Sequence, residues 1–255
     1  MNFEMLKRRL RYEHKASALA YVLRHPSLLF SVSQNPSKFY FSNTLEGILK
    51  GDIVSCLHNF LPDEFVKHLK ERSYVPGEGI PLILYLLVRA YKPEIVVETG
   101  VARGASSAFI LCSLHENKMG HLYSIDLPPN DASIISEDKA RGMITLKDGQ
   151  RLSKDCSVAG LVPEYLKERW TLVYGDSRTE LPALLSKIGK ISMFFHDSLH
   201  TYDHMLFEYE TAWSYIEKNG FLLSHDILWN KAFLDFSKKV NIRPLIYYGF
   251  GAIQK

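Results

Sequence analysis

The sequence predicts an α/β fold with a doubly wound sheet of seven strands, ending in an antiparallel hairpin and preceded by an N-terminal helical arm. From Pro93 onward, short β-rich runs alternate with helical patterns, and this alternation is typical of a parallel sheet flanked by helices. The runs are almost continuously apolar, as expected for strands buried on both faces. The last segment, Arg243–Lys255, has two β-rich runs with no room for a helix between them, which predicts the hairpin.

The N-terminal part of the chain has a different character. We expect residues 1–75 to form a helical arm interrupted by prolines, and residues 76–255 to form the main domain. Residues 1–50 carry 8 Lys and Arg against 3 Glu, so the overall charge of +3 comes from the arm. A basic helical arm suggests association, and we expect a homo-oligomer formed through it. A solvated helix face would explain the same charges.

Composition limits the class of protein. With 46% hydrophobic residues in 255, the chain can bury a large core. The apolar stretch Gly79–Val88 is about half as long as a membrane-spanning helix, so we expect a buried helix and no transmembrane segment. The charged N-terminus lacks a secretory signal, and three cysteines without CxxC spacing fit a reducing compartment, so a cytoplasmic location is expected. Basic and aromatic residues are not interleaved, which argues against nucleic-acid binding.

The elements follow one another in a regular order. We expect helices over Ser106–Asn117 and Thr201–Lys218 and another beginning near Trp229. The long polar connection over residues 127–169 predicts a lid or substrate-binding insertion, with Pro163 as the first residue of a short helix. The parallel strands are expected at Glu94–Thr99, His121–Asp126, Trp170–Gly175, Ile191–Asp197 and Phe221–Asp226.

The stretch VVETGVARGASS leads from the first strand through a glycine-marked turn into a helix. Gly100 and Gly104 permit a ligand to approach the backbone of the turn and the amides of the helix N-terminus. The spacing is not the GxGxxG of a dinucleotide fingerprint. Glu98 precedes the first glycine, and an acid at this place disfavours a pyrophosphate and suits a ligand with positive charge.

Asp126 ends the second predicted strand, 26 residues beyond Gly100. An acid at this strand tip is placed to accept hydrogen bonds from the two ribose hydroxyls of a nucleoside. A helix cap or a solvated strand end is the alternative for an isolated aspartate, but the distance from the glycine turn favours the ribose.

The order VVETGVARG, LYSID, VYGDS, FFHDSLHTY and GFLLSHDI resembles the class I S-adenosylmethionine-dependent methyltransferases. It is most similar to their small-molecule O-methyltransferase branch, related to the macrocin and cephalosporin-pathway enzymes, over about residues 75–255. The resemblance implies a Rossmann-like sheet with a terminal hairpin and S-adenosylmethionine as the cofactor. The residues that it implies for cofactor binding are Glu98, Gly100, Gly104 and Ser106 at the methionine end, Asp126 at the ribose, and Asp176 and Ser177 at the adenine.

Three histidines lie four residues apart in HDSLHTYDH, but the pattern around them does not predict one row of ligands. His196 ends the apolar strand run ISMFF. His204 lies off the apolar stripe of the following helix, beside Glu208 at i+4, and is expected at the surface. Only Asp197 and His200 are then left to face a site at the strand end.

Two chemistries remain open at this edge. Metal-dependent catechol-type relatives hold a divalent cation such as magnesium with three oxygen ligands; Asp197 and Asp226 match two of them, while His225 stands where the third carboxylate would be. This departure suits magnesium less well. The alternative is that His200, with an ordinary pKa near 6.5, accepts the proton of a substrate hydroxyl beside Asp197. Trp229 and Asn230, after the last parallel strand, are expected to line a substrate pocket or to pack in the core.

The leading hypothesis is therefore a methyltransferase that delivers the methyl group of S-adenosylmethionine to a hydroxyl of a small-molecule acceptor. A nucleotide-dependent oxidoreductase is an alternative with the same sheet but a different glycine spacing. A non-catalytic module that binds the cofactor and assembles through the basic arm is a third.

Overall fold

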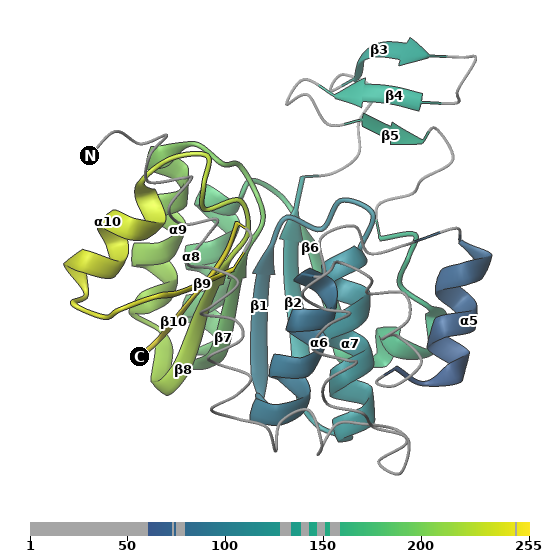
Figure 1. Cartoon of the computed structure of the whole chain (residues 1–255), viewed down its shortest axis with the longest axis horizontal. Helices are drawn as coiled ribbons and strands as arrows, with labels where there is room; N and C mark the ends of the chain where they lie inside the picture. Colours follow the sequence, from purple (N-terminus) through teal and green to yellow (C-terminus); the bar gives the residue numbers. More distant parts are fainter. Residues whose placement is uncertain are drawn as a thin grey trace.

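A computed structural model of the chain describes residues 61–72, 74, 80–127, 134–138, 143–146, 151–153, 159–247 and 249–255. Its main sheet has seven strands in the order β6-β2-β1-β7-β8-β10-β9 (Figure 1). This confirms the predicted α/β fold and its terminal hairpin. The strands are β1 (Ile95–Thr99), β2 (His121–Asp126), β6 (Trp170–Tyr174), β7 (Ile191–His196), β8 (Ile216–Ser224), β9 (Leu245–Tyr247) and β10 (Phe250–Gln254).

The direction in which the chain builds the sheet reverses next to β1. From β1 the chain continues to β2 and β6 on one side, and β7 and β8 then add to the other side of β1. These five strands are parallel, whereas β10 is antiparallel to both β8 and β9. In open parallel sheets, ligands bind outside the carboxyl ends of the strands at such a reversal.

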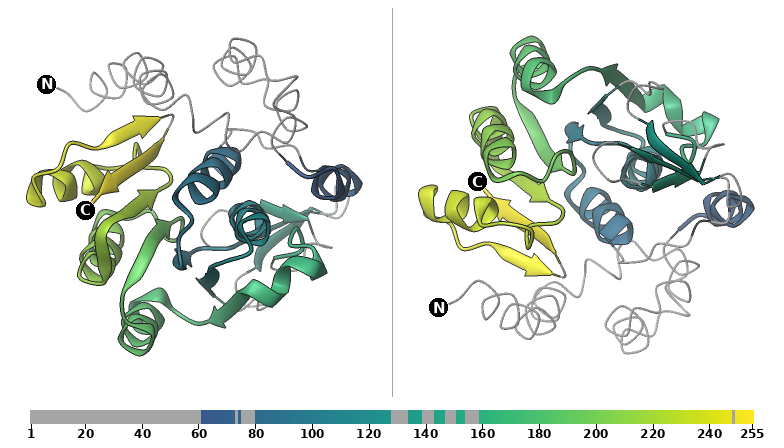
Figure 2. Two further views of the ribbon diagram at one scale, coloured as in Figure 1. Left: turned by 90° about the horizontal axis from the view of Figure 1, so that it is seen from below. Right: turned by 90° about the horizontal axis from the view of Figure 1, so that it is seen from above.

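Helices cover both faces of the sheet (Figures 1 and 2). Neighbouring residues of one strand point to opposite faces. Val96 therefore packs in the hydrophobic cluster with α6 and α7, and Val97 packs in the cluster with α8, α9 and α10. Phe194 and Phe195 alternate in the same way and are both fully buried. The bounds of the helices are Ile80–Tyr91 for α6, Ala105–Asn117 for α7, Ser177–Ile188 for α8, Tyr202–Trp213 for α9 and Ala232–Lys239 for α10.

Several of the predicted element boundaries are wrong. Helix α9 ends at Trp213 instead of Lys218, and β8 already begins at Ile216, which is buried and pairs with Ile191 of β7. Ile216 fits the apolar spacing of the helix, which is why the sequence placed it there. It is apolar because it is a buried residue of the next strand. Pro163 precedes the 3₁₀ helix η3 (Glu164–Arg169) in an extended conformation instead of starting it.

The long connection after β2 contains a sheet of its own. Strands β3 (Ile134–Asp138), β4 (Met143–Leu146) and β5 (Arg151–Ser153) form an antiparallel sheet that the sequence did not predict. Figure 1 shows it standing away from the seven-stranded sheet, beyond the ends of β2 and β6. The predicted arm lies largely outside the described residues, which include only its last helix, α5 (Asp63–Glu71). None of the described helices has both the length and the apolar character to cross a membrane.

The central strand β7 should govern the stability of the fold. Phe194→Ala removes a fully buried ring from one of the two hydrophobic clusters, and we expect it to lower the free energy of unfolding by about 3–5 kcal/mol. Urea denaturation followed by circular dichroism measures this change. The control is Tyr174→Ala on the edge strand, where the side chain is 51% exposed and the loss should be about 1 kcal/mol or less. Equal losses would contradict the assignment of β7 to the centre of the core.

Candidate functional site

The register of the parallel strands brings four residues into one row at the carboxyl edge of the sheet. Thr99 of β1 pairs with Ile125 of β2 and with His196 of β7, and His196 pairs with Ser224 of β8. The residue after each of these positions therefore lies beside the next one. The four members of the row are Asp126, Gly100, Asp197 and His225.

Backbone hydrogen bonds continue the sheet into this row. The amide of Gly100 donates to the carbonyl of Ile125, that of Asp197 to Thr99, and that of His225 to His196, at 2.8–2.9 Å. The row is thus an extension of the rigid sheet, and its side chains start from fixed backbone positions. Sites built on strands in this way hold their geometry better than sites on free loops.

Gly100 and Gly104 are required by the packing of the turn between β1 and α7. Both have positive φ angles, +85° and +83°. A Cβ atom at Gly100 would lie 2.1 Å from the carbonyl oxygen of Asp197, and one at Gly104 would lie 2.9 Å from Cα of Ala159. The sequence suggested that glycine leaves room for a ligand, and the structure adds that it leaves room for backbone from β7 and from the end of the long connection.

Asp126 and the glycine turn are in direct contact. Oδ2 of Asp126 accepts hydrogen bonds from the amides of Val101 and Ala102 at 3.0 and 2.8 Å, and Oδ1 accepts one from Leu127 at 2.8 Å. The residue is partly exposed at the tip of β2. Its carboxylate therefore fixes the turn while part of it still faces solvent, where a ligand hydroxyl can reach it.

Glu98 lies behind the turn and not on its open side. Its side chain is fully buried, and its two oxygens accept hydrogen bonds from Ser106, from Ser107 at 2.6 Å and from Ser124 at 2.7 Å. Burial raises the pKa of Glu98 to about 7, although the three hydroxyls act in the opposite direction. Glu98 and Ser106 thus hold β1, β2 and α7 together beneath the place where a ligand would bind. Sequence reasoning missed Ser107 and Ser124.

Asp176 and Ser177 face different surroundings although they are neighbours. Asp176 is exposed at the N-cap of α8, where its Oδ1 accepts a hydrogen bond from the amide of Arg178 at 2.8 Å. Ser177 is buried, and its hydroxyl lies 2.9 Å from Nε2 of His204. Only Asp176 is in a position to meet a ligand directly.

The buried carboxylate of Glu208 lies under the row. It accepts hydrogen bonds from Thr99 at 2.6 Å and Ser198 at 2.8 Å, and imidazole nitrogens of His196 and His204 lie 2.6 and 2.9 Å from its oxygens. Burial tends to raise the pKa of Glu208, but the hydrogen bonds of His196 and His204 outweigh it and hold the pKa well below its ordinary range. The group therefore remains a carboxylate inside the protein.

The expectation that His204 lies at the surface is wrong. The residue is 5% exposed and connects Ser177 with Glu208. Polarity at a position off the apolar stripe indicated solvent, but here it indicates a buried polar network. The i, i+4 spacing of His204 and Glu208 was the only signal of this pair in the sequence, and it did not reveal the three hydroxyls that complete the network, those of Thr99, Ser177 and Ser198.

Four side chains gather above this network, at the solvent side of the row. Asp197 Oδ1 lies 2.8 Å from Nδ1 of His225 and 3.6 Å from Nε2 of His200. Asp226 Oδ2 lies 3.9 Å from Nε2 of His200, and Asp226 Oδ1 lies 3.6 Å from Nε2 of His225. All four side chains are between 13% and 29% exposed. The structure thus brings together the predicted catalytic pair, Asp197 and His200, and the other two predicted metal ligands, His225 and Asp226.

The charge state of this group follows from its partners. Burial tends to raise the pKa of Asp197, but the imidazoles of His200 and His225 outweigh it, and the pKa is lowered. Asp197 therefore carries a negative charge that favours a proton or a cation on its neighbours. Asp226 has a φ of +51°, a strained angle for a residue other than glycine, and such strain is often found at functional sites.

The set of potential metal ligands differs from the predicted one. Asp197, His200 and His225 each offer one ligand atom, and these atoms all lie within 4.8 Å of one another. Asp226, predicted as the third ligand with Asp197 and His225, faces the Nε2 edge of His225, whereas Asp197 faces its Nδ1 edge. One imidazole cannot point a single nitrogen toward both carboxylates, and the predicted role of Asp226 as a metal ligand with Asp197 and His225 stays a prediction.

Trp229 and Asn230 stand next to His200. The ring of Trp229 is 66% exposed and its centroid lies 5.3 Å from that of His200, so this tryptophan is not a core residue. The side-chain amide of Asn230 donates to the backbone carbonyl of His200 at 3.0 Å. Asn230 therefore positions the histidine, and Trp229 forms an apolar wall open to solvent.

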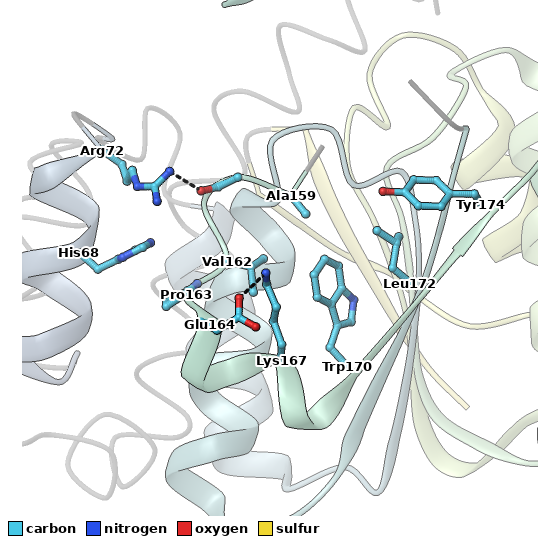
Figure 3. Close-up of a pocket in the computed structure, with 11 residues that line it drawn as sticks. His68, Arg72, Ala159, Val162, Pro163, Glu164, Lys167, Trp170, Leu172 and Tyr174 are labelled. Atoms are coloured by element: carbon cyan, nitrogen blue, oxygen red, sulfur yellow. Dashed lines mark hydrogen bonds and ion pairs between the residues drawn. The ribbon is translucent and has the colours of Figure 1, made fainter. Parts of the chain in front are cut away.

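A cavity of about 410 Å³ lies elsewhere, beside the edge strand β6 and between α5 and η3 (Figure 3). Its cationic side chains already have partners, because Lys167 contacts Glu164 at 2.6 Å and Arg72 donates to the carbonyl of Gly160 at 3.0 Å. No member of the row lines it. Its lining includes His68, Val162, Pro163, Trp170, Leu172 and Tyr174.

Comparison with known proteins identifies the domain. The family model described as a methyltransferase domain matches residues 97–227, which is more than half of the chain and extends from β1 to just beyond β8. This match favours methyl transfer over the oxidoreductase alternative. No curated protein matches the sequence.

Several solved structures share the fold. The SAH-bound Podospora anserina methyltransferase PaMTH1 has a TM-score of 0.51 at 17% identity, over 80% of this chain and 94% of that chain. The calicheamicin methyltransferase CalS11 has a TM-score of 0.50 at 17% identity, over 84% and 91%. A Klebsiella pneumoniae protein assigned as an O-methyltransferase has a TM-score of 0.50 at 14% identity, over 80% and 94%.

Glu98 should make stability depend on pH. Between its ordinary pKa of 4.5 and its raised pKa of about 7, the folded protein keeps a proton that the unfolded chain releases. Stability is therefore full below pH 4.5 and falls as the pH rises toward 7, by roughly 3 kcal/mol. Denaturant unfolding across this range should show that Glu98→Gln removes this part of the pH dependence. The exposed Glu217→Gln is the control. A slope unchanged in Glu98→Gln would contradict the raised pKa.

Proposed function

Because the chain belongs to the methyltransferase domain family, we propose that it transfers the methyl group of S-adenosylmethionine to a hydroxyl of a small molecule. One observation carries the proposal: the strand register puts the glycine turn and Asp126 directly beside Asp197 and its two histidines. A cofactor held at the first pair would present its reacting group near the second. One of the similar structures is an SAH-bound methyltransferase, which supports this cofactor.

The cofactor would lie across the ends of β1 and β2. Asp126, held against the turn by Val101 and Ala102, would accept a hydrogen bond from a ribose hydroxyl through Oδ1, which accepts only one bond from the protein, from Leu127. Such charge-assisted bonds contribute about 1.5–3 kcal/mol each. Asp176, exposed at the end of the next strand, would contact the adenine.

The buried members of the predicted set would act indirectly. Glu98 and Ser106 would fix the turn from beneath, since their polar atoms bond to each other. Ser177 would hold the end of β6 to the Glu208 network through His204. These residues would position the residues that touch the cofactor and would not contact it themselves.

His200 would accept the proton of the acceptor hydroxyl. As the hydroxyl oxygen bonds to the methyl carbon, the bond from that carbon to the cofactor sulfur breaks, and the proton passes to Nε2 of His200. The products are the methyl ether and S-adenosylhomocysteine, and the proton then leaves to solvent. The negative charge of Asp197, 3.6 Å from Nε2, stabilises the protonated imidazole. A base of this kind typically contributes about 10²- to 10⁴-fold.

Calorimetry with S-adenosylhomocysteine tests the cofactor assignment. Asp126→Ala removes the ribose acceptor, and we expect the affinity to fall by about 10- to 100-fold, the equivalent of one strong charge-assisted bond or more. Asp63→Ala, an exposed change on α5, is the matched control and should leave binding unchanged. Absence of binding to the wild type, or equal affinity in Asp126→Ala, would refute the assignment.

Kinetics on His200→Ala test the base. With the best acceptor from a panel of hydroxylated small molecules, turnover should fall by about 10²- to 10⁴-fold, because the proton then has no acceptor near the oxygen. Affinity for S-adenosylhomocysteine should stay within about twofold, as His200 lies outside the proposed cofactor contacts. His115→Ala on α7 controls for loss of a histidine. Parallel losses of affinity and turnover in His200→Ala would instead make the residue structural.

A further inference from the structure

The end of the long connection is bonded to the glycine turn between β1 and α7. The amide of Ala159 donates to the carbonyl of Ala102 at 2.9 Å, and the amide of Leu161 donates to that of Arg103 at 3.0 Å. The two backbones are so close that a Cβ atom at Gly104 would lie 2.9 Å from Cα of Ala159. The turn therefore rests on this part of the connection, and a displacement of one displaces the other.

Both sides of this contact are strained. Ala102 has a φ of +47° and Ala159 has a φ of +63°, angles that are unfavourable for alanine. Strained backbone of this kind persists only where the surrounding structure holds it in place. Residues 159–162 must therefore be held against the turn by contacts on their other side.

Helix α5 provides these contacts (Figure 3). Nε2 of His68 donates to the carbonyl of Leu161 at 3.1 Å, and the guanidinium of Arg72, at the end of the helix, donates to the carbonyl of Gly160 at 3.0 Å. Leu161 is thus bonded to the turn through its amide and to α5 through its carbonyl. Residues 159–162 connect the helix with the turn.

Helix α5 is itself anchored to α7, which begins where the turn ends. Phe65, Val66 and Leu69 of α5 are 2% exposed or less and belong to the same hydrophobic cluster as α7. The rings of Phe65 and Phe109 pack edge to face, with 5.2 Å between their centroids. The apolar face of α5 therefore packs against α7, while two of its polar side chains hold residues 159–162.

We propose that α5 controls the affinity for the cofactor, with His68 and Arg72 as residues that position the glycine turn through residues 159–162. Neither side chain belongs to the row at the sheet edge, and both act through backbone carbonyls. The family model matches only from residue 97 onward, so α5 lies outside the part of the chain that identified the domain. The effect on the cofactor rests on the proposed function, whereas the support that α5 gives to the turn does not.

The support given by α5 reaches the cofactor through the population of the formed turn. A ligand that binds only the formed turn has an apparent affinity proportional to the fraction of molecules in which the turn is formed. Loss of a hydrogen bond from α5 lowers that fraction. His68 contributes more than Arg72, because its bond is partly buried and that of Arg72 is exposed to water.

Hydrogen exchange of the ligand-free protein, measured by mass spectrometry, tests the support of the turn. His68→Leu removes the donor at similar side-chain size, and peptides that contain Gly104, Ala159 and Leu161 should exchange about 2- to 10-fold faster, the range for one hydrogen bond. His68→Gln supplies a donor again and should restore the rates. Ile253→Val, a fully buried change in β10 of comparable cost to stability, should leave these peptides unchanged.

Calorimetry with S-adenosylhomocysteine on the same proteins tests the link to the cofactor. Affinity should fall by about 2- to 10-fold in His68→Leu and further when Arg72→Met is added. It should recover in His68→Gln and stay unchanged in Ile253→Val and in Asp63→Ala, an exposed change on the same helix.

Unchanged exchange or unchanged affinity in His68→Leu would overturn the inference, as would equal losses in His68→Leu and His68→Gln. A loss of affinity in Ile253→Val as large as that in His68→Leu would also overturn it, because the effect would then follow from stability in general. If the wild type does not bind S-adenosylhomocysteine, the proposed function falls, and the exchange rates alone decide whether α5 holds the turn.

Discussion

The carboxylate of Glu208 is the interaction on which the arrangement of the site depends. It lies on α9 and reaches Thr99 at the end of β1, and His196 and Ser198 at the end of β7. Through His204 it also reaches Ser177 at the start of α8. A buried charge is tolerated only when its hydrogen-bonding capacity is filled. Because those partners come from three different elements, filling it fixes the ends of β1, β7 and α8 relative to one another.

The two buried glutamates beneath the site solve the same problem in different ways. Glu208 is partnered by imidazoles, which stabilise the ionised form and keep its pKa low. Glu98 has only hydroxyls from Ser106, Ser107 and Ser124, and burial raises its pKa to about 7. Hydroxyls can donate to a carboxylate or accept from a carboxylic acid. The pocket of Glu98 therefore accommodates either form, while that of Glu208 demands a charge on the carboxylate.

The sequence was sufficient to find the five parallel strands of the main sheet, since buried parallel strands give apolar runs whose ends are marked by Asp126, Asp197 and Asp226. It did not predict β3, β4 and β5, which lie in the polar connection. It was also sufficient to expect that Asp197 and His200 face one site. It could not place His204, because a polar residue in a helix looks the same whether it meets water or a buried acid. Nor could it show which edge of the His225 ring each of the two carboxylates, Asp197 and Asp226, meets.

The composition of the row at the sheet edge follows from register alone. Thr99 pairs with both Ile125 and His196, and the next residues are then forced to be neighbours. A slip of one residue between β7 and β8 would exchange the side chains that the strands present to the two hydrophobic clusters. The clusters that hold Phe194 and Phe195 therefore also enforce the contact of Asp197 with His225. The chemistry of the edge is in this sense set by the core.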